Sequence, residues 1–351
     1  MITVRKELDI PCQYDLSRLG DPGKLLFFDI ETTGLSPYAS SLYLIGCLYR
    51  EDGRWQFVQW LAESLSDELD MLRAFDGLVR RFDVLVHFNG DTFDLPYLKS
   101  AAEQYGYAHA FDTPASFDIL KQLRKKKRFF GLPNLRLKTV ERFLGIFRED
   151  RFSGGELIEI YQQYTQTKDE RLMRLFLLHN EDDLKGMLKI LPVLNYCDLL
   201  DRPALDVSEH WFSASGSELF AVAKLRDAFP APLSYETLEG ARLKIENGEL
   251  SFRIPCFFGT LKYFYPDWKD YYYLPVEDTA IHKKVASFVD PHYRKQATKD
   301  TCYTKADGVF LPALPHTASP VFRAARTDKA GFVQFSEAML GAYLEETLRS
   351  V

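Results

Sequence analysis

The sequence predicts an α/β fold, with a mixed sheet flanked by helices and a smaller C-terminal α+β domain. A nearly unbroken apolar run at residues 24–30 (KLLFFDI) is typical of a central strand that is covered on both faces. Strand-like runs at 42–50 and 54–61, separated by the turn-forming residues 51–53 (EDG), indicate an antiparallel meander. From residue 66 onward helical and strand-like patterns alternate, which predicts helices packed against that sheet.

The elements after the meander can be placed by their periodicity. Between Ser66 and Phe82 apolar residues recur three and four positions apart, and Ser66 is placed to cap the start of this helix. A fourth strand is expected at 84–88, and helices are expected at about 94–105, 136–145, 156–165 and 168–195. Three meandering strands followed by a helix and a strand is the order found in ribonuclease-H-like sheets, so we expect such a domain at residues 1–200.

The character of the sequence changes beyond Asp201. Residues 242–254 (RLKIENGELSFRI) predict a hairpin, because Asn247-Gly248 is a favoured two-residue turn. Pairing across that turn sets Ile245 opposite Leu250 and, on the same face, Leu243 opposite Phe252. Aromatic-rich, strand-like sequence continues through 257–276, so we expect an α+β domain at 207–351 that binds nucleic acid or a protein partner.

Length and composition describe an ordinary two-domain globular protein. The chain has 351 residues, of which 46% are hydrophobic and 27% charged. It contains no run of eighteen apolar residues, and its start lacks the pattern of a secretory signal, so we expect a soluble, cytoplasmic protein. The five cysteines are widely spaced, which favours buried, reduced thiols over a disulfide framework or a zinc site.

Negative charge is concentrated in the first two thirds of the chain. The net charge is -6, and residues 241–351 carry 15 Lys and Arg against 13 Asp and Glu, which leaves 29 against 37 for residues 1–240. An acidic segment that handles nucleic acid needs something to neutralise its carboxylates. Bound metal cations would do so.

Paired carboxylates end the first strand. In residues 29–35 (DIETTGL), Asp29 and Glu31 lie two apart and so point to the same face of a strand. Hard cations such as Mg²⁺ prefer oxygen ligands of this kind. A plain strand-to-turn edge is the alternative interpretation.

A second acidic motif follows the fourth strand, where residues 87–98 (HFNGDTFDLPYL) place Asp94 at the start of a helix. Asp94 could simply cap that helix, a favourable position for Asp. A third motif lies within a helical stretch at 179–183 (HNEDD), where a spacing of four puts His179 and Asp183 on one helix face. A solvated charged face is the alternative for that motif.

Together the three motifs resemble those of the DEDD superfamily of 3′–5′ exonucleases, most closely the YprB ribonuclease-H-like family, over residues 24–195. Residues 135–141 (LRLKTVE) also look like a family element. The resemblance implies that the catalytic metal ligands are Asp29, Glu31, Asp94 and Asp183. It also implies a general base. One branch of the superfamily has a histidine five residues before the last aspartate, and the other has a tyrosine four residues before it. Here His179 lies four residues before Asp183, which is the spacing of the tyrosine branch. Asp182 is the alternative to Asp183 as the metal ligand from the third motif.

The chemistry that the resemblance implies is hydrolysis of phosphodiester bonds in single-stranded DNA or RNA. Carboxylates alone would repel the negative charge that develops on the phosphoryl group, and two Mg²⁺ or Mn²⁺ ions would reverse that repulsion. We expect Asp29 to contact both ions, Glu31 and Asp183 to complete one site, and Asp94 to serve the other. Neutral His179 would accept a proton from the attacking water.

Substrate contacts are expected beside the acidic motifs and in a basic run. The motif residues with this expected role are Thr32, Thr33, Leu35, Asn89 and Phe93. The run Arg124, Lys125, Lys126, Lys127 and Arg128, next to Phe129 and Phe130, could grip phosphates and stack a base. Further mixtures of aromatic residues and cations at 262–265, 271–273, 282–284 and 292–295 suit single-strand binding, or simply fill a core.

Two other functions fit the same fold. One is a catalytically silent ribonuclease-H-like module that only binds nucleic acid or a protein. The other is a structure-specific endonuclease. A polymerase proofreading domain is a third comparison, but only about 150 residues follow the nuclease part, too few for a polymerase.

Overall fold

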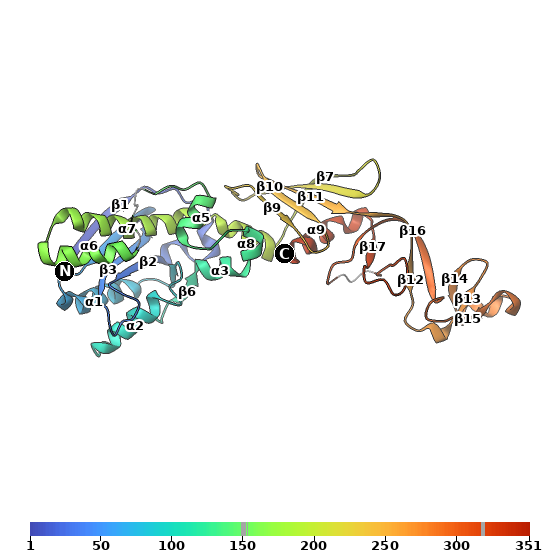
Figure 1. The fold of residues 1–351 in the computed structure, drawn as a ribbon, viewed down its shortest axis with the longest axis horizontal. Helices are drawn as coiled ribbons and strands as arrows, with labels where there is room; N and C mark the ends of the chain where they lie inside the picture. The colour runs from blue at the N-terminus through green and yellow to red at the C-terminus, as the bar shows by residue number, and fades with distance from the viewer. Residues whose placement is uncertain (149–151, 153, 317–319) are drawn as a thin grey trace. The chain divides into compact units, whose positions relative to one another are not determined.

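The computed structural model describes residues 1–148, 152, 154–316 and 320–351, which form two compact units. The first comprises Met1–Asp198 and Asp227–Ala231, and the second comprises Leu199–Arg226 and Pro232–Val351 (Figure 1). No helix within the described ranges is long and apolar enough to cross a membrane.

A six-stranded mixed sheet forms the centre of the first unit, as expected for a ribonuclease-H-like fold. Its strands lie in the order β1-β4-β3-β2-β5-β6. The pairs β1–β4, β4–β3 and β3–β2 are antiparallel, whereas β2–β5 and β5–β6 are parallel. The strands are β1 (Ile2–Leu8), β2 (Leu25–Thr32), β3 (Leu42–Glu51), β4 (Arg54–Leu61), β5 (Val84–His87) and β6 (Ala115–Asp118).

The sequence pattern identified four of these six strands. The edge strands β1 and β6 were missed, because β1 (ITVRKEL) carries several charges and is mostly exposed, while β6 has only four residues. Such short or charged segments lack the apolar run by which buried strands are identified.

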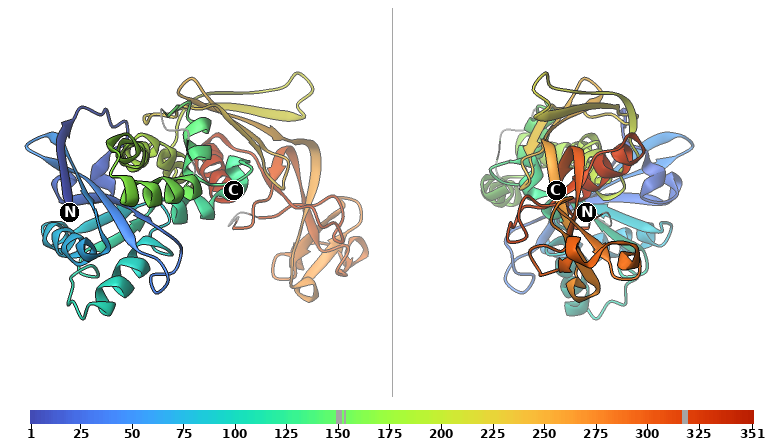
Figure 2. Two further views of the ribbon diagram at one scale, coloured as in Figure 1. Left: turned by 60° about the vertical axis from the view of Figure 1, so that its left-hand side comes forward. Right: turned by 90° about the vertical axis from the view of Figure 1, so that its right-hand side faces the viewer.

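Helices cover both faces of this sheet. Phe28 of β2 packs against Phe75, with ring centroids 5.2 Å apart, whereas the next residue, Asp29, contacts Asn180 on the other face. In the left view of Figure 2, the green helices α6 and α7 lie on one side of the blue strands, and α1 and α2 lie on the opposite side. The helices of this unit are α1 (Glu68–Val79), α2 (Asp94–Gln104), α3 (Ile119–Lys125), α4 (Lys127–Phe130), α5 (Leu137–Phe143), α6 (Gly154–Thr167), α7 (Glu170–Ile190) and α8 (Val193–Asp201).

Two details of the predicted helices were wrong. Ser66 does not cap α1: a 3₁₀ turn, Leu65–Asp67, precedes the helix, and the Asp67 carboxylate accepts backbone N–H bonds from Glu63 and Ser64. The single helix expected at 168–195 is divided into α7 and α8. Pro192 lies at the division, and proline supplies no N–H to continue a helix.

Helix α7 approaches the sheet most closely at Gly46 of β3. Gly46 pairs with Asp29 on one side and with Gln59 on the other, so these three residues form a row across the sheet. A Cβ atom on Gly46 would lie 1.9 Å from Asn180 Oδ1 and 2.7 Å from Leu184 Cδ1. Glycine inside a strand marks such an approach. It allows Asn180 to lie over the row, accepting a bond of 2.8 Å from Gln59 Nε2 and donating one of 2.9 Å to Asp29 Oδ2.

The second unit contains three small sheets and, among its described residues, one α-helix, α9 (Leu340–Arg349). Its sheets have the orders β7-β8-β11-β10-β9, β12-β16-β17 and β14-β13-β15. The strands are β7 (Asp206–Phe212), β8 (Glu218–Lys224), β9 (Leu233–Glu236), β10 (Arg242–Glu246), β11 (Glu249–Pro255), β12 (Phe257–Phe264), β13 (Tyr271–Leu274), β14 (Thr279–His282), β15 (Lys295–Gln296), β16 (Tyr303–Pro312) and β17 (Phe332–Gln334).

The predicted hairpin of this unit is confirmed in register. Ile245 pairs with Leu250 and Leu243 with Phe252, and all four side chains are buried. Asn247 and Gly248 have φ of 53° and 77°, the left-handed values that this two-residue turn requires.

The cysteines of the described chain are all free thiols, as expected, but only three are buried. Cys47, Cys197 and Cys302 are buried, whereas Cys12 and Cys256 are partly exposed.

The contact at Gly46 can be tested by Gly46→Ala. The added methyl group must displace Asn180 and Leu184, so we expect a loss of about 1–3 kcal/mol in the free energy of unfolding. Urea denaturation measures it. Gly77→Ala in α1, where an added Cβ meets no atom within 4 Å, is the control. A Gly46→Ala protein as stable as the control would contradict the close approach.

Candidate metal centre

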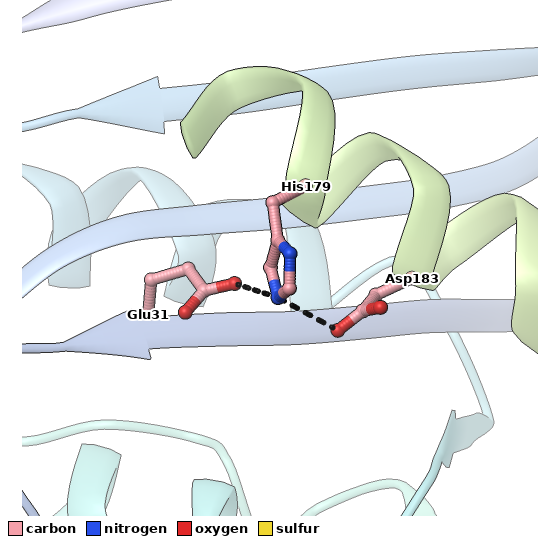
Figure 3. A group of neighbouring side chains, drawn as sticks. All are labelled: Glu31, His179 and Asp183. Carbon is pink, nitrogen blue, oxygen red and sulfur yellow. Dashed lines mark ion pairs between the residues drawn. The ribbon is translucent and has the colours of Figure 1, made fainter. Parts of the chain in front are cut away.

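The first and third acidic motifs meet between the end of β2 and the middle of α7. Glu31, His179 and Asp183 each offer one ligand atom, and these atoms lie within 4.8 Å of one another. His179 Nε2 lies 3.7 Å from Glu31 Oε1 and 3.7 Å from Asp183 Oδ2 (Figure 3). All three side chains are largely buried, with exposed fractions of 13% for Glu31, 7% for His179 and 19% for Asp183.

Asp29 lies on the same face of β2 as Glu31, where alternation along the strand places it. Burial raises the pKa of Asp29 well above its usual value, and three neighbouring carboxylates raise it further. In decreasing order of effect, these neighbours are Asp183, Glu31 and Asp94. The bond donated by Asn180 acts in the opposite direction. The Asp29 carboxylate is therefore in an environment that favours a bound proton or a bound cation.

Asp94 does more than begin a helix. The N-cap position of α2 is Phe93, which makes no side-chain capping bond, and Asp94 is the first helical residue. Its Oδ1 accepts a bond of 3.2 Å from the N–H of Ile30, near the end of β2. Burial raises the pKa of Asp94 to about 7, against the opposing effect of its backbone N–H bonds. The second motif is thus tied to the strand that carries the first.

The two aspartates that compete in the third motif lie in different surroundings. Asp183 faces His179 and Glu31, whereas Asp182 lines a separate small pocket with Glu141 and Lys185. The structure therefore brings Asp183, rather than Asp182, to the cluster. Together with Asp183, the residues Asp29, Glu31, Asp94 and His179 form the acidic cluster.

A second group of potential ligands, His87, Asp91 and Asp118, is already engaged by protein atoms. His87 Nδ1 accepts a bond of 3.0 Å from Gly90 N–H, and its Nε2 lies 2.7 Å from Ser116 Oγ. Asp91 bonds Lys121 at 2.8 Å, and Asp118 accepts the N–H of Asn89 at 2.9 Å. Burial lowers the pKa of His87, which favours the neutral ring. This group holds the loop before Asp94 in place.

The predicted substrate residues near the first motif surround a tight turn. Thr32 Oγ1 donates to Gly34 O at 2.7 Å, and Thr33 Oγ1 accepts from Ser41 N–H at 2.9 Å. Leu35 is 86% exposed. Phe93 packs against Tyr97, with ring centroids 5.9 Å apart.

The basic run borders a groove that begins at the second motif. The groove has a volume of about 500 Å³, and its polar lining includes Asn89, Arg124, Lys127 and Arg136. Asn89, whose φ of 72° is left-handed, accepts a bond of 3.2 Å from Arg124 Nη2 through its Oδ1. Lys125 instead bonds Gln122, and Lys126 lies partly buried between two short helices, with Arg128 exposed.

The base-stacking role predicted for Phe129 and Phe130 is wrong. Both rings are buried, with exposed fractions of 2% and 6%, and they contact other aromatic rings. The run supplies cations to the surface, while its aromatic residues fix the short helix α4 to the core.

Aromatic residues and cations of the second unit also contact one another. Tyr265 stacks on Tyr271 with centroids 4.6 Å apart, and Lys262 Nζ lies 4.1 Å from the ring centre of Tyr303. Most of these tyrosines are only partly buried. One part of each side chain therefore packs against its neighbours in the small sheets, and the other part is accessible to solvent.

Sequence reasoning missed two residues that contact the acidic cluster. Asn180 bonds Asp29, and Arg148 forms ion pairs with both Asp183 and Glu141. Asn180 stands inside the third motif and could have been noticed there. Gly186, a glycine within a helix, was a further signal, since a Cβ at that position would lie 2.1 Å from Glu141 Oε1.

Comparison with known proteins identifies similar segments in archaeal polymerases. A 92-residue segment is 36% identical to a DNA polymerase of Thermococcus aggregans, and a 94-residue segment is 34% identical to a DNA polymerase of Pyrococcus glycovorans. Each match covers 24% of this chain but only 5% and 12% of the two polymerases, so the chain spans a small part of their length.

A solved structure of the family B DNA polymerase from the hyperthermophilic archaeon Pyrobaculum calidifontis matches with a TM-score of 0.40 and 16% identity, over 68% of this chain and 33% of that one. The family model described as the RNase H superfamily matches residues 26–195, which include the whole acidic cluster. Residues 26–195 of this chain are thus similar to the RNase H superfamily.

Proposed function

We propose that this protein is a metal-dependent 3′–5′ exonuclease that hydrolyses phosphodiester bonds of single-stranded DNA or RNA. The observation that carries the proposal is the convergence of four carboxylates and one imidazole from β2, α2 and α7 on one buried site. The match of residues 26–195 to the RNase H superfamily model supports a nuclease role. The 3′–5′ polarity rests on the motif resemblance to DEDD exonucleases.

The side chains of the acidic cluster suit divalent cations. The ligands would be Asp29, Glu31, Asp94 and Asp183, an all-oxygen set of the kind that Mg²⁺ and Mn²⁺ prefer. The raised pKa values of Asp29 and Asp94 indicate charge that lacks compensation within the protein. When bound, two such ions would neutralise the developing phosphoryl charge and activate a water molecule.

The remaining residues of the site would position these ligands and move a proton. Asn180 fixes the Asp29 carboxylate through one oxygen, and the Ile30 N–H does the same for Asp94. We assign proton acceptance from the attacking water to His179 Nε2, which faces two of the proposed ligands.

The groove beside Asn89 would receive the nucleic acid strand. Arg124 and Lys127 line it and would contact phosphates, as would Arg136, which lies in the same lining. We assign Thr32, Thr33, Leu35 and Phe93 to contacts with the terminal nucleotide, since they lie next to the ligands in the first and second motifs. Domain boundaries at 1–200 and 207–351, binding of nucleic acid or a partner by the second domain, and a cytoplasmic location remain predictions.

Asp29→Asn tests the metal site. The amide should preserve the fold but lose a charged ligand, so degradation of end-labelled single-stranded DNA and RNA with Mg²⁺ or Mn²⁺ should fall by about 100-fold or more. Asp70→Asn, on an exposed face of α1, is the matched control. A folded Asp29→Asn protein as active as the wild type would rule out the assignment. Degradation of a circular substrate would indicate an endonuclease instead.

His179→Ala tests the proposed base. Loss of a general base typically costs about 10²- to 10⁴-fold in rate, so we expect the variant to degrade the labelled strands more slowly by such a factor. Rates are measured from pH 6 to 9, and circular dichroism shows whether the variant is folded. Full activity over that whole range would remove His179 from the mechanism.

Replacing Arg124 and Lys127 by Glu tests the groove. Each phosphate interaction that is lost should reduce the steepness of log affinity against log salt concentration by about 0.7 for a single strand, so loss of both should reduce it by about 1.4. Fluorescence anisotropy with labelled single strands measures the slope. Lys99→Glu on α2, outside the groove, is the control, and equal slopes for both proteins would exclude the groove as the strand-binding surface.

A further inference from the structure

A buried chain of charges leads from α5 to the acidic cluster. Arg148 Nε donates to Glu141 Oε2, and Arg148 Nη1 donates to Asp183 Oδ1. The side chains of Glu141 and Arg148 are 2% and 8% exposed, so this Glu141–Arg148 pair is almost fully removed from water.

Helix α7 is adapted to this pair by Gly186. A Cβ atom there would lie 2.1 Å from Glu141 Oε1 and 3.2 Å from Arg148 Nη2. Glycine costs about 1 kcal/mol relative to alanine inside a helix. The glycine therefore makes room for the pair directly beside Asp183.

The pair engages one oxygen of Asp183. Arg148 binds Oδ1, while Oδ2 lies 3.7 Å from His179 Nε2, on the side of Glu31. A carboxylate bonded in this way cannot rotate freely, and it offers its other oxygen to the acidic cluster. Partners outside the ligands themselves commonly orient metal ligands in this manner.

We propose that Arg148, held by Glu141, is a positioning residue that directs Oδ2 of Asp183 toward the divalent cation of the proposed nuclease site. The inference rests on the proposed function, because it assumes that Asp183 is a metal ligand. The positive charge of Arg148, taken alone, disfavours a bound cation, so tighter Mn²⁺ binding after its removal would indicate charge compensation and contradict the positioning role.

A purely structural role does not account for the arrangement. Buried ion pairs contribute little net stability, because desolvation offsets their attraction. Glu141 Oε1 and Arg148 Nη2 are buried and make no hydrogen bond within the described protein, which an interaction selected for stability alone would avoid. Burial raises the pKa of Glu141, which shows the cost of keeping this carboxylate charged, and Arg148 opposes that effect.

The test compares two ways of disturbing the pair without changing a proposed metal ligand. Gly186→Ala pushes Glu141 away, and the double variant Glu141→Gln, Arg148→Gln removes both charges, so neither is left buried alone. Gly77→Ala in α1, a helix glycine with open space around it, is the matched control. Calorimetric titration of the full chain with MnCl₂ alone gives the metal affinity, and thermal unfolding without metal gives the stability.

We expect Gly186→Ala and the double variant to bind Mn²⁺ about 10- to 100-fold more weakly than the wild type. Gly77→Ala should bind it as the wild type does, and high Mn²⁺ concentrations should restore part of the missing nuclease activity. Unchanged Mn²⁺ affinity in either folded variant, with or without a lower unfolding temperature, would overturn the positioning role. If the double variant does not fold, Gly186→Ala decides the question alone.

The same experiment separates this inference from the function on which it rests. A wild-type protein that neither binds Mn²⁺ nor degrades nucleic acid would overturn both. A wild-type protein that does both, with variants that bind Mn²⁺ equally well, would overturn only the role of Arg148.

Discussion

The arrangement of the site depends on the approach of α7 to the backbone of β3 at Gly46. Because that position has no side chain, the Asn180 amide lies above the row formed by Asp29, Gly46 and Gln59. The amide oxygen accepts from Gln59, so the amide nitrogen faces the Asp29 carboxylate. Beside this contact, α7 presents His179 and Asp183, one helical turn apart, to the end of β2.

Four carboxylates held this close repel one another, and three of them are bonded by different donors. Asp29 has the Asn180 amide, Asp94 has a backbone N–H of β2, and Asp183 has the Arg148 guanidinium. Each donor binds one oxygen and leaves the carboxylate with capacity for a cation. The cluster is therefore ordered by hydrogen bonds but remains short of positive charge, as the raised pKa of Asp29 indicates.

Much of the fold and all five residues of the acidic cluster could be named from the sequence. Buried strands and amphipathic helices repeat with a period, and the motif that contains Asp29 and Glu31 combines such a strand with paired acids. Arg148 could not be found in this way, because it reaches Asp183 from a loop 35 residues away and belongs to no pattern. The aromatic residues of the basic run misled us for a related reason: sequence does not show whether Phe129 points outward or inward.

The edges of the six-stranded sheet have a consequence for self-association. An exposed strand edge can pair with a strand of a second molecule and so begin aggregation. At one edge, β1 carries Arg5, Lys6 and Glu7 in succession, and at the other, β6 has only four residues and ends in Asp118. Neither edge therefore offers a long, uncharged strand with which a strand of a second molecule could pair, and this disfavours extension of the sheet between molecules.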